Sequence, residues 1–130
     1  MIIILAGPVH KGKTTLIQRS LSRWASRGLR FGGFLSIAVR EGKGPVEYDF
    51  LDLKDGRRLP FLRRVGEPDW EKIGPFYFVP KTLEIARALI LGSDPGEVLI
   101  VDEVGPLELA HGGLWPALRE VLFKPERKTL

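Results

Sequence analysis

Cysteine is absent from this sequence of 130 residues. Disulfide bonds, thiol nucleophiles and zinc or iron–sulfur centres ligated by cysteine are therefore excluded. Asparagine is also absent, and methionine and glutamine each occur once, whereas arginine and glutamate are abundant. This usage is typical of proteins that work at high temperature, because it avoids thermolabile side chains.

Long apolar runs are absent as well. The first six residues are apolar, but no basic residue precedes them and Gly7 ends the run. No later run approaches the ~20 residues that a membrane-spanning helix needs. We therefore expect neither a signal peptide nor a membrane span, and we predict a soluble, cytoplasmic protein.

The size and charge of the chain set further limits. A hydrophobic fraction of 44% in 130 residues suits a core that needs no disulfide or structural metal, so we expect one domain over residues 1–130. The formal net charge of +4 suits a polyanionic ligand without choosing among nucleotide, nucleic acid and anionic surface. Nucleic acid is not expected as a partner, because the basic residues are scattered and no basic tract carries interleaved aromatic residues.

Apolar periodicity predicts alternating strands and helices. The predicted strands are residues 1–6, 31–39, 75–79 and 98–101, and the predicted helices are residues 14–27, 81–91 and 116–122. The β-prone runs on either side of Asp55-Gly56 indicate an inserted antiparallel hairpin over about 46–64 with a type I′ turn. This order predicts an α/β domain with a mainly parallel sheet, in which sites form at the carboxyl ends of strands.

Residues 7–15, GPVHKGKTT, contain the pattern G-x-x-x-x-G-K-[ST] between a predicted strand and a predicted helix. Glycines let successive backbone N–H groups point at phosphate oxygens, where a helix N-terminus adds a positive field. We expect Lys13 to act as a catalytic residue at the β and γ phosphates, and the Thr14 hydroxyl to bind Mg²⁺. An ordinary strand-to-helix turn with an exposed lysine is the alternative. The predicted nucleotide-binding residues are Gly7, Pro8, Val9, His10, Lys11, Gly12, Lys13, Thr14 and Thr15.

Two carboxylates, Asp102 and Glu103, follow the strand predicted at 98–101. We expect Asp102 to hold Mg²⁺ through its water shell, together with Thr14. We expect Glu103 to polarise the water that attacks the γ phosphate, as a general base. Strands that end in acidic residues are common, so this interpretation depends on the pairing of these carboxylates with residues 7–15.

Other polar residues are weaker candidates. His111 is more typical of a surface histidine than of a ligand. The aromatic residues Trp24 and Phe34 are not site candidates, because they are predicted to lie in the core. An arginine finger would neutralise charge on the γ phosphate, although exposed hairpin positions are the favoured interpretation of each candidate. The candidates are Arg40, Arg63 and Arg64.

Five blocks of the sequence carry a family resemblance: GPVHKGKTTLI, GGF…VR, EYDFLDLKDGRRLPFLRRVG, GPFYFVP and VLIVDEVGPLEL. In this order, and along nearly the whole chain, they resemble the P-loop nucleoside-triphosphatases first known from thermophiles, which have a cancer-related human relative. The P-loop alone is generic, whereas DEVGPLEL and the hairpin block are specific to the group. The resemblance implies a three-layer RecA-like core, Mg²⁺ as cofactor, slow hydrolysis of ATP, GTP and other nucleoside triphosphates, and Glu103 as the catalytic carboxylate.

The sequence departs from the family at three places. Val9, His10 and Lys11 stand where relatives have small residues, and Ile37 and Ala38 stand where relatives often carry acids. Relatives also continue into a further strand, which in RecA-like sheets lies between the P-loop strand and the Asp-Glu strand. We therefore expect a C-terminally truncated chain in which these two strands either pair directly or leave a gap, which a partner fills by domain swapping.

The leading prediction is a nucleoside-triphosphatase, and three alternatives remain open. A small-molecule kinase would need an arginine-rich lid and a second substrate pocket, and neither is clear in the sequence. A non-catalytic GTP-binding accessory protein of the molybdopterin-guanine dinucleotide biosynthesis B type would share the P-loop, but Glu103 after Asp102 favours a hydrolase. A nucleic-acid-binding module would use the hairpin arginines.

Overall fold

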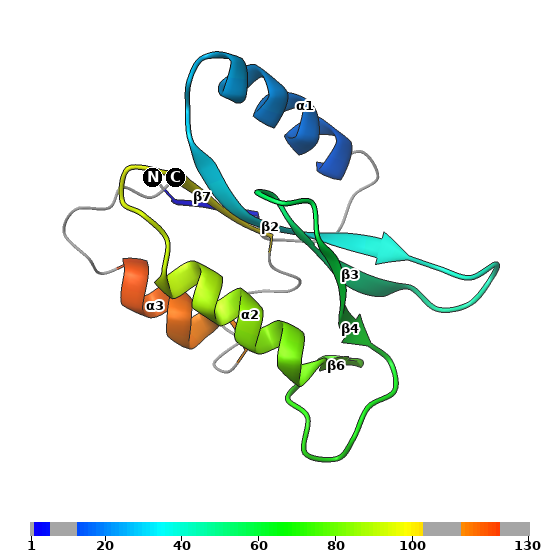
Figure 1. Ribbon diagram of the computed structural model, residues 1–130. Coiled ribbons are helices and arrows are strands. Elements are labelled where there is room, and N and C mark those ends of the chain that lie inside the picture. Colours follow the sequence, from blue (N-terminus) through cyan, green and yellow to red (C-terminus); the bar gives the residue numbers. More distant parts are fainter. Residues whose placement is uncertain (1, 6–12, 103–112, 123–130) are drawn as a thin grey trace.

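The computed structural model describes residues 2–5, 13–102 and 113–122. Within them, helices cover both faces of one sheet, with α1 on one side and α2 and α3 on the other (Figure 1). The strands are β1 (Ile2–Leu5), β2 (Phe31–Val39), β3 (Glu47–Asp52), β4 (Arg58–Arg63), β5 (Lys72–Ile73), β6 (Phe76–Phe78) and β7 (Val98–Asp102), and the helices are α1 (Lys13–Ser26), α2 (Pro80–Leu91) and α3 (Trp115–Leu122).

The sheet has the strand order β1-β7-β2-β3-β4-β6-β5. Strands β1, β7 and β2 are parallel, whereas β2, β3, β4, β6 and β5 pair antiparallel with their neighbours. The prediction of a mainly parallel sheet is therefore wrong for the described residues. The cause is the short connections after β2, because a short loop can join only antiparallel neighbours.

The turn between β3 and β4 also differs from the prediction. A type I′ turn needs positive φ at both central residues, but only Gly56 has it, with φ of 74°. The loop is longer: the N–H of Asp52 donates to the carbonyl of Arg57 at 2.9 Å. The carboxylates of Asp52 and Asp55 each accept the N–H two residues on, at 2.8 and 2.7 Å, and these Asx turns stabilise the longer loop.

Helix boundaries follow the local signals closely. Helix α1 ends in a Schellman motif: Gly28 has φ of 77°, and the N–H of Leu29 donates to the carbonyl of Trp24 at 3.1 Å. Pro80 opens α2, and the N–H of Gly92 donates to Ala88 at its end. The predicted helices are thus confirmed to within one residue at each end. None of the helices in the described ranges is long and apolar enough to cross a membrane.

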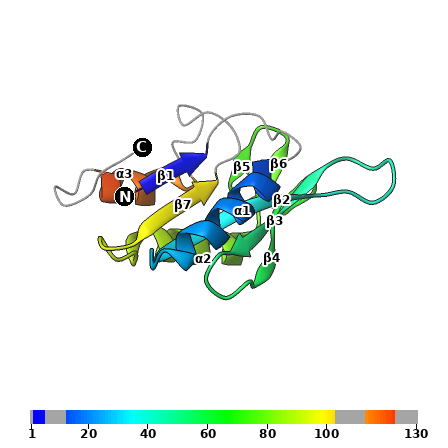
Figure 2. The same ribbon diagram turned by 90° about the horizontal axis from the view of Figure 1, so that it is seen from above.

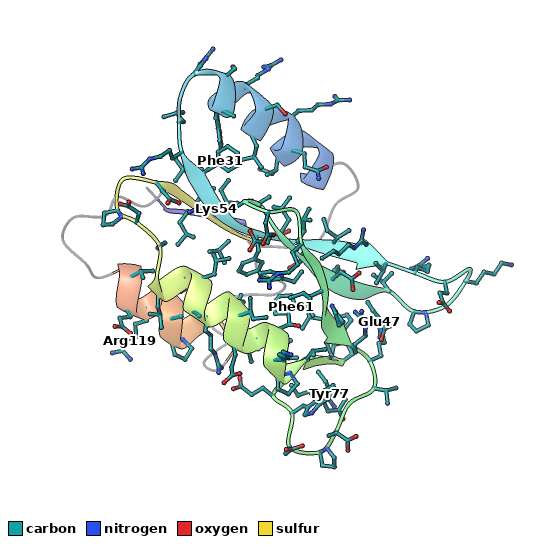
Figure 3. The ribbon with its side chains drawn as sticks, viewed as in Figure 1. Phe31, Glu47, Lys54, Phe61, Tyr77 and Arg119 are labelled. Atoms are coloured by element: carbon teal, nitrogen blue, oxygen red, sulfur yellow. The ribbon has the colours of Figure 1, made fainter. Side chains whose placement is uncertain are left out.

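Two hydrophobic cores lie on the two faces of the sheet. Under α1, Leu21 packs with Leu35 and Ile100, and the half-buried Trp24 borders them. The other core, under α2 and α3, contains a row of phenylalanines. Rings of Phe34 and Phe50 stack at 4.8 Å, and Figure 3 shows Phe61 on the α2 side of the sheet. Trp24 and Phe34 therefore both contribute to core packing, as predicted.

Candidate active site

Strands β1 and β7 end side by side, at the carboxyl ends of the parallel strands. Their parallel register pairs Ile4 with Val101 and Leu5 with Asp102. The chain then passes from Leu5 through residues 6–12 to α1, which begins at Lys13. Figure 2 shows β1, β7 and β2 lying next to one another, with α1 across the sheet. The fold thus brings Asp102 to the strand end from which the G-x-x-x-x-G-K-[ST] motif starts.

Asp102 is held by β2. It is only 2% exposed, and its Oδ2 accepts the N–H of Ser36 at 3.1 Å. The Ser36 hydroxyl donates to the carbonyl of Asp102, also at 3.1 Å. The regular pairing of β2 with β7 ends at Phe34 and Val101. Beyond this point, Ser36 keeps the two strands in contact through hydrogen bonds that involve side chains. These two bonds fix both the backbone and the carboxylate of Asp102 at the carboxyl end of β7.

Sequence reasoning missed Ser36. It is 1% exposed and is the one polar residue in the run FLSIAV. A hydroxyl in such a run needs a buried partner, and this requirement was the available signal. What the sequence could not give is the partner, because Ser36 and Asp102 lie 66 positions apart in the chain.

The other predicted site residues fall in two groups. Lys13, Thr14 and Thr15 form the first turn of α1, so the helix begins inside the motif as a phosphate-binding loop requires. The remaining predicted residues lie outside the described ranges: Gly7, Pro8, Val9, His10, Lys11, Gly12, Glu103 and His111.

Two of the three candidate arginine fingers bind the hairpin itself. Arg63 donates to Asp49 Oδ1 at 2.7 Å and to the carbonyl of Tyr48 at 2.8 Å. The Arg64 Nε donates to the carbonyl of Val46 at 3.2 Å, and its guanidinium also lies 4.8 Å from the centre of the Phe76 ring on β6. These contacts favour the structural interpretation of Arg63 and Arg64. Arg40 is exposed and directly follows β2.

The residue types predicted to bind Mg²⁺ fit this ion. The sequence offers a hydroxyl from Thr14 and a carboxylate from Asp102, and both are hard oxygen ligands of the kind that Mg²⁺ prefers. In the part of the chain that the structure describes, no three His, Cys, Asp or Glu side chains gather into a metal-holding group. A full protein cage is not required, because Mg²⁺ on phosphates keeps most of its waters and takes one or two protein ligands.

Comparisons with known proteins identify the family of the chain. A family model described as NTPase matches residues 2–130. The chain is 31% identical over 121 residues to "Nucleoside-triphosphatase THEP1" of Thermofilum pendens, covering 92% of this chain and 66% of that protein. It is 34% identical over 134 residues to the human "Cancer-related nucleoside-triphosphatase", and the alignment covers 95% of this chain and 70% of the human protein. No solved structure matches the chain significantly.

The similarity is spread over nearly the whole chain. A third relative, "Nucleoside-triphosphatase THEP1" of Ignicoccus hospitalis, is 32% identical over 123 residues, covering 94% of this chain and 67% of the relative. The chain thus spans about two thirds of the length of these curated relatives. A match to the family model over residues 2–130, together with these relatives, shows that the chain belongs to the NTPase family, a family of hydrolases named nucleoside-triphosphatases.

Proposed function

We propose that this chain hydrolyses nucleoside triphosphates, including ATP and GTP, to the diphosphate and phosphate at the shared carboxyl end of β1 and β7. One observation supports this most: the parallel register of Leu5 with Asp102. It puts a buried carboxylate next to the strand end that leads into a phosphate-binding motif, while α1 begins at Lys13 of the same motif.

The residues would divide the work as follows. Backbone N–H groups of residues 7–12, the start of α1 and Lys13 bind the phosphates, since a helix N-terminus favours anions. Thr14 and Asp102 hold Mg²⁺, which when bound neutralises charge on the β and γ phosphates. The nucleotide-binding set is Gly7, Pro8, Val9, His10, Lys11, Gly12, Lys13, Thr14 and Thr15.

Glu103 would act on the attacking water. Its carboxylate accepts a proton as the water oxygen forms a bond to the γ phosphorus. The bond from that phosphorus to the β–γ bridging oxygen breaks, and the diphosphate leaves with the electron pair. The proton then passes to the released phosphate or to solvent, which restores the carboxylate.

The decisive variant is Glu103→Gln, with Glu108→Gln as a matched control in the same segment. We expect Glu103→Gln to lower kcat by about 10²- to 10⁴-fold. Its affinity for Mg²⁺ and a non-hydrolysable nucleotide should change little, because the phosphates are bound elsewhere. Phosphate release would be measured with ATP, GTP, CTP and UTP, with and without Mg²⁺. Unchanged release in Glu103→Gln would reject the role of Glu103.

The same assay separates hydrolysis from the rival activities. Phosphate release without any added acceptor argues against a kinase, which transfers the γ phosphate to a second substrate. Turnover of any nucleoside triphosphate argues against a non-catalytic GTP-binding accessory protein. Tight nucleotide binding with no release by the wild-type chain would overturn the proposed activity.

We also propose a RecA-like arrangement into which the β3–β4 hairpin is inserted, and self-association by strand exchange. Helices on both faces of the parallel strands support the first proposal. Of the two expected arrangements, the described strands have the direct one, because β1 pairs with β7 from Ile2 to Leu5 and leaves no gap between them. What supports self-association is instead the outer edge of β1, which has no other partner strand among the described residues. Size-exclusion chromatography with light scattering tests it, and a stable monomer would argue against exchange.

A further inference from the structure

Gly113, just before α3, is held by two charged side chains from other parts of the chain. The Arg87 Nε donates to the carbonyl of Gly113 at 2.6 Å, and the N–H of Gly113 donates to Glu71 Oε2 at 2.6 Å. The second Glu71 oxygen, Oε1, accepts from the Arg87 Nη2 at 2.8 Å. We call these three residues the Gly113 clamp. Both polar groups of Gly113 are therefore bound by the ion pair.

The position of Gly113 is fixed sterically as well. It has φ of 56°, which glycine adopts without the strain that other residues meet. A Cβ atom there would lie 2.9 Å from the ring of Phe78 on β6. Glu71 is tied to the same strand, because its carbonyl accepts the N–H of Phe78 at 2.8 Å. Phe78 of β6 thus supports the clamp in two ways: its ring lies against Gly113, and its backbone N–H binds Glu71.

The hydrogen bonds of the clamp involve charged groups. Hydrogen bonds between charged groups and backbone groups are roughly twice as strong as neutral ones, and the guanidinium of Arg87 uses separate nitrogens for its two partners. The pKa of Glu71 fits this geometry. Burial alone would raise it, but the hydrogen bonds from Arg87 and Gly113 and the charge of Arg87 outweigh burial and lower it.

The clamp lies at one end of the segment that carries Glu103. Residues 103–112 leave the described structure at Asp102, which Ser36 holds, and return to it at Gly113. Contacts from outside the segment thus fix both of its ends. Ser36 fixes the first on β2, and Glu71 with Arg87 fixes the second.

We propose that Glu71 and Arg87 are positioning residues that hold the Glu103-bearing segment for hydrolysis. This rests on the proposed function, in which Glu103 orients the attacking water. Neither side chain needs to touch the nucleotide, because each acts through Gly113. Loss of either should therefore lower kcat more than nucleotide affinity, since a displacement of about 1 Å at a catalytic group costs up to roughly 10²-fold in rate.

The test compares Arg87→Met, Arg87→Lys and Glu71→Ala with the wild-type chain. Arg119→Met is the matched control: Arg119 is exposed on α3, points away from the sheet (Figure 3), and makes no hydrogen bond or ion pair to described residues. All would be assayed at a temperature where circular dichroism shows every variant folded. We expect roughly ten- to hundredfold lower kcat for Arg87→Met and Glu71→Ala with KM changed less than about twofold. Arg87→Lys should recover part of the loss, because one donor remains.

Amide hydrogen exchange supplies a readout that does not depend on activity. Exchange at the Gly113 amide should be on the order of ten- to hundredfold faster in Glu71→Ala, because the hydrogen bond from this N–H to the Glu71 carboxylate is lost. Exchange over residues 103–112 should be faster in both Glu71→Ala and Arg87→Met, because each loses a hydrogen bond between Gly113 and a charged group. Arg119→Met should match the wild type. Unchanged exchange, or faster exchange with unchanged kcat, would overturn the positioning role. If the wild-type chain itself releases no phosphate, the proposed hydrolysis fails, while exchange still decides whether the clamp holds the segment.

Discussion

Ser36→Ala tests whether the hydroxyl of β2 holds Asp102 in place. The substitution removes the bond from Ser36 Oγ to the carbonyl of Asp102 and leaves the backbone N–H that binds Asp102 Oδ2. Because Ser36 is 1% exposed, water does not readily replace the lost donor. Alanine fits the same space, so no steric clash confuses the result.

The expected magnitude follows from this geometry. A buried neutral hydrogen bond contributes about 1 kcal/mol net, and a polar partner left without its donor adds to the loss. We therefore expect Ser36→Ala to lower the free energy of unfolding by about 1–2 kcal/mol. For a domain of this size, that corresponds to a Tm lower by about 4–8 °C. The effect on kcat should be only a few-fold, because the bond to the carboxylate itself remains.

Urea denaturation would measure the free energy of unfolding, and phosphate release would measure kcat and KM. Ser22→Ala is the matched control, since the Ser22 hydroxyl is exposed and bonds only within α1, to Gln18 at 3.3 Å. Its effect should stay within about 0.5 kcal/mol. Equal unfolding free energies for Ser36→Ala and the wild type would refute the inference that this hydroxyl fixes the end of β7.

Two further predictions concern the sheet and the clamp. Gly33→Ala should destabilise the chain by more than about 4 kcal/mol, because Gly33 has φ of 112° and a Cβ would overlap the carbonyl oxygen of Ile100 on β7. Gly42→Ala, at a positive φ in open space, should cost only about 1 kcal/mol by thermal denaturation, and equal losses would contradict the steric argument. For Glu71→Gln, the stability difference from the wild type should be full above the unfolded-state pKa of about 4.3 and disappear as pH falls through the lower folded-state pKa. Melting curves between about pH 3 and 8 check this, and a difference that grows toward low pH would give the wrong sign.

Local signals predicted most elements well. The run Phe31–Val39 was predicted as a strand with the bounds that β2 has, because turn residues flank an apolar stretch. Gly28 and Gly92 marked the ends of α1 and α2. These features depend on neighbouring residues in the chain, which a single sequence displays directly.

Features that depend on distant residues were missed or wrong. The two-residue strand β5 is too short for any periodicity and forms only because Lys72 and Ile73 pair with β6. Which strands pair in parallel depends on the whole connection pattern. The antiparallel hairpin over about 46–64 was predicted, whereas the antiparallel pairing of β2 with β3, and of β6 with β4 and β5, was not. At the candidate site, the sequence alone was enough to identify the residues of the phosphate-binding motif. The hydrogen-bond partner of Asp102 and the contacts of Gly113 could be identified only from the three-dimensional structure.

The antiparallel half of the sheet is connected to the site by packing. Ring centres of Phe34 and Phe61 lie 5.7 Å apart, and those of Phe61 and Phe78 lie 5.4 Å apart, so one aromatic row runs from β2 through β4 to β6. At one end of this row, Phe34 lies two positions before Ser36 on the strand that holds Asp102. At the other end, Phe78 packs under Gly113. The row therefore packs continuously from the strand that holds Asp102 to the residue that precedes α3, with the close packing typical of protein interiors. The antiparallel strands thus pack between the two described positions that border residues 103–112, even though the predicted phosphate-binding residues all precede these strands in the chain.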